Sequence, residues 1–253
     1  MAEPILSVEG LNKSFGGVVA TQNLDFEVEQ GEIHAVIGPN GAGKTTFVAQ
    51  LSGMLKPDSG RIVFDGNDVT HLSAPARSHA GLARSFQITS VFRNFTALQN
   101  VALSIQAHSG HSFRMWKPAA TDAALNDPAQ EILEQVGLGA RADILAANLA
   151  HGEQRQLEIA MALATRPKML LLDEPTAGMG PEDTQRITEF LAGLKGTYSM
   201  LLIEHDMDTV FALADRITVL VYGRAIATGT PEAIRANDEV RAAYLGEEEA
   251  EIA

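Results

Sequence analysis

Nine consecutive residues near the start of the chain combine three glycines with a lysine and two threonines, a composition suited to binding phosphate groups. Glycines allow successive backbone N–H groups to point at a bound anion, the lysine adds a positive charge, and a threonine hydroxyl can bind Mg²⁺. A glycine-rich turn that fits this pattern by chance is the alternative. The predicted phosphate site comprises Gly38, Pro39, Asn40, Gly41, Ala42, Gly43, Lys44, Thr45 and Thr46, and Thr45 is also expected to bind the metal.

Two adjacent carboxylates form a second group of residues that could take part in catalysis. Asp173 and Glu174 directly follow the apolar run 169–172, which predicts a buried strand. Asp173 is expected to hold Mg²⁺ through water, and Glu174 to activate the attacking water as a general base. Apolar strands also end in acidic residues for purely structural reasons. The presence of the phosphate loop favours the catalytic interpretation.

The segments around these residues predict the elements that would position them. The apolar run 33–37 predicts a buried strand before the phosphate loop, and residues 44–55 predict a helix whose positive N-terminal end faces the phosphates. The runs 169–172 and 200–203 are continuous and apolar, as expected of parallel strands buried on both faces. Together with these strands, two further helices favour a parallel sheet with right-handed crossovers. Those helices are expected at 153–164 and 181–194.

Two other regions complete the predicted organisation. Residues 87–139 have a helical pattern, broken by a polar stretch at 108–128, and are expected to form an inserted helical subdomain. Short alternating segments predict antiparallel strands and a closing hairpin. These segments are 5–8, 24–28, 61–64, 216–221 and 224–228. The predicted fold class is α/β.

The bulk composition limits the class of protein. The chain has 253 residues, of which 45% are hydrophobic, enough for one large domain or a core with a smaller subdomain. Its formal net charge of −13 disfavours nonspecific nucleic-acid binding, which depends on clustered lysine and arginine. The chain has no cysteine, no apolar run of membrane-spanning length and no secretion signal at its N-terminus, so we expect a cytoplasmic protein without disulfides or thiolate metal sites.

Taken together, the motifs resemble those of the ATP-binding cassette (ABC) ATPases. Besides the phosphate loop and the segment 172–176, this family has a signature segment, which residues 149–156 match. It also has a glutamine that opens the helical subdomain, matched by Gln87, and a histidine that ends a later strand, matched by His205. The resemblance covers nearly the whole chain. It implies a single P-loop NTPase domain with a mostly parallel sheet, an antiparallel β subdomain and an inserted helical subdomain, divided at 1–86, 87–165 and 166–253.

The resemblance also implies roles for single residues. Phe15 matches the aromatic position on which adenine stacks, although a core phenylalanine at a strand end is the alternative. Gln87 would reach Mg²⁺ or the attacking water, and His205 would hydrogen-bond the γ-phosphate. The signature residues would meet the ATP bound to a second subunit, so that two cassettes enclose two nucleotides. These signature residues are Ala150, His151, Gly152 and Glu153.

The signature segment departs from the commonest pattern of the family. Ala150 stands where serine is usual, which removes one possible contact with the γ-phosphate, His151 stands where glycine is frequent, and Glu153 stands where glutamine is frequent. Gly180, in the loop after Glu174, occupies a position where aspartate is common. We therefore expect communication between subunits to depend more on backbone groups.

Several segments are similar to the ATP-binding subunits of branched-chain amino acid importers. These segments are 81–87, 91–95, 150–159 and 175–179. This similarity implies an ATP-hydrolysing motor at the inner face of the plasma membrane, working as a homo- or heterodimer beneath two transmembrane permease subunits. A periplasmic solute-binding protein would be an indirect partner, and nucleic acid would not be one.

Other members of the family, and one other class of enzyme, are alternatives. Urea or amide importers and the motor of lipopolysaccharide export have similar segments, and a non-transport ATP-dependent clamp is a further possibility. A P-loop kinase is disfavoured, because it would leave the signature segment and His205 unexplained. Val91, Phe92 and Phe95 lie where the family receives a short helix of the membrane subunit, and packing inside the subdomain is the alternative for them.

Overall fold

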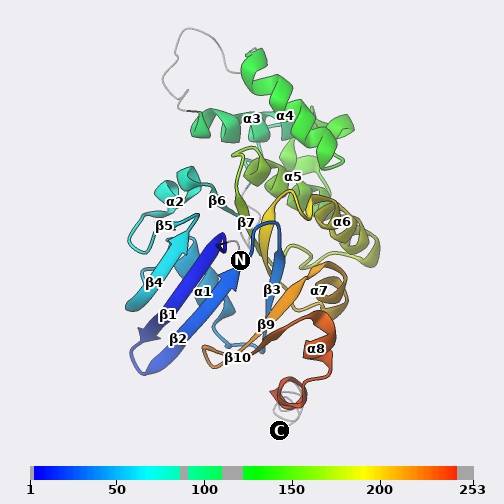
Figure 1. The fold of residues 1–253 in the computed structure, drawn as a ribbon. Coiled ribbons are helices and arrows are strands. Elements are labelled where there is room, and N and C mark those ends of the chain that lie inside the picture. The colour runs from blue at the N-terminus through cyan, green and yellow to red at the C-terminus, as the bar shows by residue number, and fades with distance from the viewer. Residues whose placement is uncertain (1–2, 86–90, 110–121, 244–253) are drawn as a thin grey trace.

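Two β-sheets and a set of helices make up the described part of the chain, which comprises residues 3–85, 91–109 and 122–243 of a computed structural model (Figure 1). The first sheet is antiparallel. Its order is β2 (Val18–Val28), β1 (Leu6–Phe15), β4 (Ser59–Phe64) and β5 (Asn67–Asp68). This sheet confirms the predicted antiparallel unit, although β1 and β2 run further than the segments 5–8 and 24–28.

The second sheet is parallel except for one edge strand. Its order is β10 (Arg224–Gly229), β9 (Arg216–Val221), β3 (Ile33–Ile37), β8 (Ser199–Ile203), β7 (Met169–Asp173) and β6 (Leu82–Arg84). The predicted parallel strands and the closing hairpin β9–β10 are confirmed. The three residues of β6 were not predicted, because so short a strand has no periodicity to detect.

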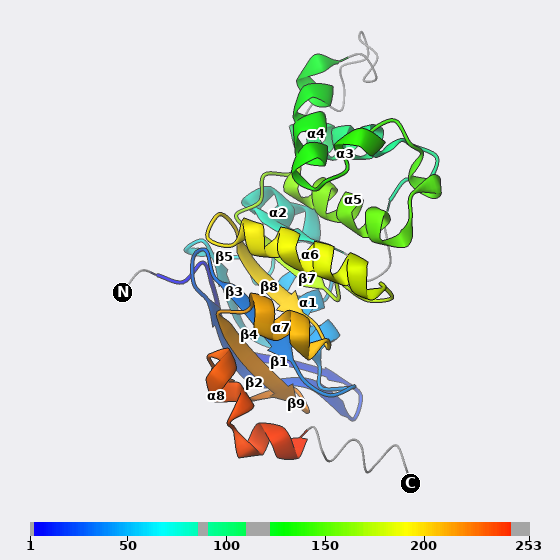
Figure 2. The same ribbon diagram turned by 90° about the vertical axis from the view of Figure 1, so that its right-hand side faces the viewer.

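Alternation of side chains explains why the central strands are apolar throughout. In β8, Leu201 and Ile203 pack with the antiparallel sheet and α1 (Lys44–Leu51), whereas Met200 and Leu202 pack on the opposite face. Successive side chains of a strand point to opposite faces, so a strand covered on both sides needs apolar residues at every position. The helices α6 (Pro181–Leu194) and α7 (Met207–Leu213) cover that opposite face (Figure 2).

A group of helices lies to one side of both sheets and contains α3 (Ala97–His108), α4 (Ala123–Gln135) and α5 (His151–Leu163) (Figures 1 and 2). The helices α3, α4 and α5 bury a common apolar core that continues into the parallel sheet. Short 3₁₀ turns at Gly139–Arg141 and Ala146–Asn148 lie between α4 and α5. The remaining short helices are α2 (Ala74–Ala80) and α8 (Pro231–Arg235).

The predicted bounds of three helical segments were wrong. The helix α1 ends at Leu51 rather than at residue 55, because Gly53 takes a positive φ of 76° that a right-handed helix cannot continue. The polar stretch 108–128 is partly helical: α3 continues to His108, and α4 contains Pro128 and buries its apolar stripe despite the proline. The helix α5 begins at His151 instead of residue 153.

Candidate nucleotide-binding site

The predicted catalytic segments follow the carboxyl ends of neighbouring parallel strands. The strand β3 leads into the phosphate loop, β8 leads to His205, and β7 ends with Asp173. In the sheet register, Val36 of β3 lies beside Ile203 of β8, which in turn lies beside Asp173. The phosphate loop, His205 and the carboxylates therefore start from one edge of the sheet, the place where open α/β sheets bind their ligands.

Two glycines of the phosphate loop are required by the close approach of other backbone segments. A Cβ atom on Gly43 would overlap the carbonyl oxygen of Ala20 in β2, and a Cβ on Gly38 would overlap that of Leu220 in β9. Gly43 also has a φ of 101°, a conformation that side chains other than hydrogen disfavour. Packing and backbone geometry both require glycine at Gly43.

The N-terminal end of α1 has the features of an anion-binding site. Gly43 is its N-cap residue and offers no side-chain acceptor, and no acidic residue lies in the first turn, so the positive end of the helix is not neutralised there. Lys44 donates from Nζ to the carbonyl oxygens of Gly38 and Pro39, the latter at 2.9 Å. These groups fit a chain of phosphates. The oxygen donors of Thr45 and Asp173 are of the kind that Mg²⁺ prefers.

Asp173 is buried at the end of β7 and is paired with an arginine. Arg84 of β6 donates from Nη2 to Oδ2 at 2.9 Å, and from Nη1 to the hydroxyl of Ser52, just after α1, at 3.1 Å. Burial raises the pKa of Asp173, the Arg84 charge and hydrogen bond lower it, and the neighbouring Glu174 raises it, leaving it above its usual value. Asp173 is thus tied to the strand that leads toward Gln87, which itself lies outside the described residues.

Glu174, the predicted general base, lies where the chain leaves the sheet in an unusual conformation. Its φ is 50°, and its backbone N–H donates to the carbonyl oxygen of Ile203 at 2.9 Å. A left-handed backbone at a residue other than glycine costs roughly 1–2 kcal/mol and recurs at functional sites. The bond to Ile203 joins the turn after β7 to the end of β8.

His205 is exposed, and its backbone is held by a buried neighbour. Its side chain is 67% exposed, so the imidazole is accessible to a ligand at this edge of the sheet. Its backbone N–H donates to Oε2 of Glu204 at 3.1 Å, and Oε1 of Glu204 accepts from the N–H of Thr176 at 2.9 Å. Sequence reasoning did not identify this role of Glu204.

Phe15 lies at the end of β1 and is not a core residue. Its side chain is 52% exposed, which rules out the alternative of a buried phenylalanine. The ammonium of Lys13 is 5.5 Å from the ring centroid. The exposed ring is compatible with adenine stacking, which stays a prediction.

Comparisons with known proteins identify the family. A family model described as ABC transporter matches residues 21–177. The chain is also 41% identical to the high-affinity branched-chain amino acid transport ATP-binding protein LivG of Escherichia coli (strain K12), over 98% of this chain and 100% of that protein. This chain belongs to the ABC transporter ATP-binding family.

Further comparisons agree with this ABC membership. A model described as branched-chain amino acid ATP-binding cassette transporter matches residues 226–250. The high-affinity branched-chain amino acid transport ATP-binding protein BraF of Pseudomonas aeruginosa is 39% identical, over 98% of this chain and 100% of that protein. The ADP conformation of MJ1267, an ATP-binding cassette of an ABC transporter, superposes with a TM-score of 0.85 at 30% identity, covering 97% of this chain and 100% of that one. The predicted family and fold class are confirmed.

The predicted signature segment, residues 149–156, lies at the start of α5 and includes its N-cap residue. The N-cap residue Ala150 has no side-chain acceptor, and Oε2 of Glu153 accepts its backbone N–H at 2.9 Å. Arg141 donates to both Glu153 oxygens, at 3.0 and 3.2 Å. Burial raises the pKa of Glu153, but the bonds to Ala150 and Arg141 outweigh it and leave that pKa below its usual value. The carboxylate at this position therefore caps α5, and an arginine compensates its charge.

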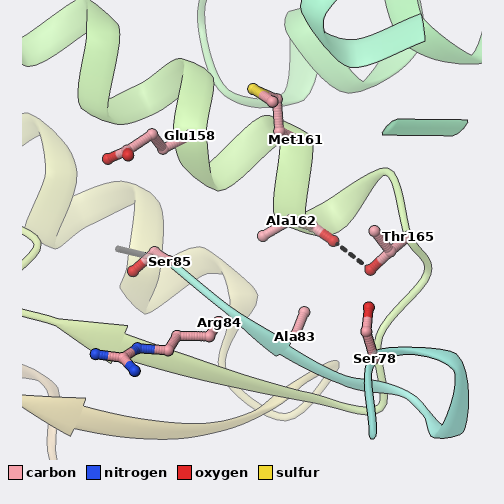
Figure 3. A pocket seen from close by; sticks show the side chains of 8 residues that line it. All are labelled: Ser78, Ala83, Arg84, Ser85, Glu158, Met161, Ala162 and Thr165. Carbon is pink, nitrogen blue, oxygen red and sulfur yellow. Dashed lines mark hydrogen bonds between the residues drawn. The ribbon is translucent and has the colours of Figure 1, made fainter. Parts of the chain in front are cut away.

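Charged residues at the junction of α5 and β6 also escaped the sequence reasoning. Arg155 and Glu158 form a buried pair at 2.8 Å within α5, and Arg84 lies on β6. Glu158 and Arg84 line a pocket of about 160 Å³ between these elements (Figure 3). The sequence did contain one signal that could have identified them: Arg84 stands within a short apolar segment. Burying its charge is costly unless the charge is paired.

Proposed function

We propose that this chain is the ATP-hydrolysing motor of an ABC importer for branched-chain amino acids. The observation that carries the proposal is the meeting of the phosphate loop, two carboxylates and His205 at one edge of the parallel sheet. The names of the relatives LivG and BraF support the choice of substrate. Substrate selection itself would lie in other subunits.

The reaction would divide its work among residues of this edge. Lys44 and the N–H groups at the start of α1 would hold the phosphates of ATP, and Thr45 and Asp173, with Gln87, would hold Mg²⁺, which offsets the negative charge of the phosphates. Glu174 would accept the proton of the attacking water. His205 would donate a hydrogen bond to the γ-phosphate and keep it in line with that water.

A second cassette would complete the site. The first turn of α5, with Ala150, His151, Gly152 and Glu153, would direct its N–H groups at the γ-phosphate bound to the partner cassette. Its own carboxylate, Glu153, is compensated by Arg141 and so opposes an approaching phosphate less than a free carboxylate would. Binding of ATP would close the dimer and hydrolysis would reopen it. The partner cassette would be a second copy of this chain or a related chain.

Two exposed aromatic residues support docking of the membrane subunits. Phe92 and Phe95 are 51% and 41% exposed, and their ring centroids are 5.6 Å apart. The buried amide of Asn100 orders their loop: its Oδ1 accepts the N–H of Phe92 at 2.7 Å, and its Nδ2 donates to the carbonyl oxygens of Phe92 and Thr96 at 3.1 and 2.9 Å. Val91 instead packs against the core. A rigid loop with two exposed rings suits an apolar helix of a partner.

The proposed place of the chain is the inner face of the plasma membrane, beneath two permease subunits that receive solute from a periplasmic binding protein. None of the helices within the described ranges is both long and apolar enough to cross a bilayer. We propose the division at 1–86, 87–165 and 166–253, in which the middle part moves with the membrane subunits relative to the nucleotide-binding core.

Two substitutions test the proposal. Glu174→Gln is expected to bind ATP as the wild type does but to hydrolyse it about 10²- to 10⁴-fold more slowly, because the base is lost. Lys44→Ala tests the phosphate-binding role and should lose most of its ATP affinity in calorimetry. Gel filtration with ATP should show Glu174→Gln as a dimer. Wild-type hydrolysis by Glu174→Gln, or unchanged ATP affinity in Lys44→Ala, would contradict the assigned roles.

A further inference from the structure

Glu204 is a buried carboxylate beside the nucleotide site to which the proposed reaction assigns no role. It directly follows β8, and its side chain is fully buried. Removing an ionised carboxylate from water is costly unless hydrogen bonds compensate it. The donors that surround Glu204 therefore indicate what it holds together.

These donors come from two different segments of the chain. The Oε1 atom accepts the backbone N–H of Thr176 at 2.9 Å and also the Thr176 hydroxyl. The Oε2 atom accepts the backbone N–H groups of His205 at 3.1 Å and of Asp206 at 3.5 Å, and Nδ1 of His205 lies 3.8 Å away. In the part of the chain that the structure describes, no lysine or arginine forms an ion pair with this carboxylate. Its bonds thus serve to join two loops.

We propose that Glu204 is a positioning residue that fixes His205 relative to Glu174. Thr176 lies two residues after Glu174 in the same loop, and the N–H of Glu174 is itself bonded to Ile203 at the end of β8. One carboxylate therefore connects the loop of the residue that would contact the γ-phosphate with the loop of the residue that would activate water. This inference rests on the proposed function and adds to it a residue that acts through its neighbours.

Glu204→Gln changes the hydrogen bonds of this side chain but keeps its size, so it tests the connection between the two loops. An amide has one oxygen and one NH₂ group, so in either orientation the NH₂ faces a backbone N–H, of Thr176 or of His205, from which it cannot accept a hydrogen bond. One link is lost while the side-chain volume is kept. Because a misplacement of about 1 Å can lower a rate about 100-fold, we expect kcat to fall by that order while the dissociation constant for ATP stays within about two-fold. A smaller fall of kcat, below about three-fold, overturns the proposal.

A second pair of variants keeps the test decisive if Glu204→Gln does not fold. Thr176→Ser keeps both the hydroxyl and the N–H donor to Glu204, whereas Thr176→Val keeps only the N–H. We expect Thr176→Ser to hydrolyse ATP as the wild type does and Thr176→Val to be slower, with similar affinity for ATP. Equal kcat values for these two variants would overturn the inference.

Glu32 provides the control for the loss of a buried carboxylate elsewhere. It accepts the N–H of Glu29 at 2.6 Å and pairs with Arg216 at 2.8 Å, just before β3 and thus at the opposite end of that strand from the phosphate loop. Glu32→Gln should lower the free energy of unfolding without lowering kcat. An equal loss of kcat in Glu32→Gln and Glu204→Gln would assign the effect to general destabilisation and overturn the inference.

The same assay distinguishes this inference from the proposed function on which it rests. A wild-type chain that does not hydrolyse ATP, measured with the full-length protein, would overturn the proposed function and this inference with it. An active wild type together with an equally active Glu204→Gln would overturn the inference alone. Glu174→Gln, measured in parallel, gives the rate that remains when the base itself is lost.

Discussion

The buried histidine of β3 makes the stability of the fold depend on pH. His34 is 1% exposed, and its Nδ1 lies 2.8 Å from the carbonyl oxygen of Glu27, so Nδ1 carries the proton. Its Nε2 lies 2.8 Å from the hydroxyl of Thr218 and accepts from it in the neutral ring. Burial and the positive charge of Arg216 lower the pKa of His34 from 6.5 to about 3, although the bond to Glu27 opposes the shift. The folded chain therefore keeps this ring neutral at moderately acid pH.

The sign and the size of the effect follow from the two pKa values. Between pH 6.5 and pH 3, the unfolded chain binds a proton at His34 that the folded chain does not bind. Stability from this group is therefore fully present near neutral pH and falls as the pH drops below 6.5. Because one pKa unit corresponds to about 1.4 kcal/mol, the free energy of unfolding should fall by about 2 kcal/mol between pH 7 and pH 5 through this group alone.

Urea unfolding of the nucleotide-free chain at the two pH values measures this change. Carboxylates also titrate on acidification, Glu32 beside the ring among them, so the wild type is compared with His34→Gln, which keeps a polar side chain but has no proton to gain. We expect the stability difference between the two chains to shrink by about 2 kcal/mol from pH 7 to pH 5. A difference that stays constant would refute the assignment of a neutral buried ring to His34.

Two further predictions concern the nucleotide site. Gly43→Ala should weaken ATP binding in calorimetry at least about ten-fold, because its Cβ would overlap the backbone of β2. Gly41→Ala shares the strain of a positive φ, 77° against 101° at Gly43, but its Cβ would meet open space, so it should weaken binding less. Equal losses would show that the close packing is not limiting. Phe15→Ala should weaken ATP binding about five-fold through lost stacking, and Phe15→Tyr should retain it; unchanged affinity in Phe15→Ala would exclude adenine from this ring.

The local motifs could be predicted from the sequence because each is contiguous. The phosphate loop, its strand and its helix follow one another within about twenty residues, so spacing alone predicts their arrangement. The apolar runs 169–172 and 200–203 predicted buried parallel strands because burial on both faces requires apolar residues at every position. Periodicity and motif spacing report local constraints well.

Contacts between distant segments could not be predicted in this way. Arg84 and Asp173 are 89 positions apart, and Glu204 and Thr176 are 28 positions apart, yet each pair shares a hydrogen bond. No pattern within a single segment encodes such a partner. The start of α4 was missed for a related reason, since the burial of its apolar stripe outweighs the unfavourable Pro128.

The hydrogen bonds of Asp173 and Glu204 explain how the parallel sheet could hold the loops that follow its strands. Strand register places the ends of β3, β8 and β7 side by side, but it does not place the residues that follow those ends. Asp173 connects β7 to β6 through Arg84, and Glu204 connects the loop after β8 to the loop after β7. A ligand that displaced one of these loops would have to displace its bonded neighbour as well. Such linkage would let this end of the sheet respond to a bound nucleotide as one unit, which is the property that the proposed motor requires.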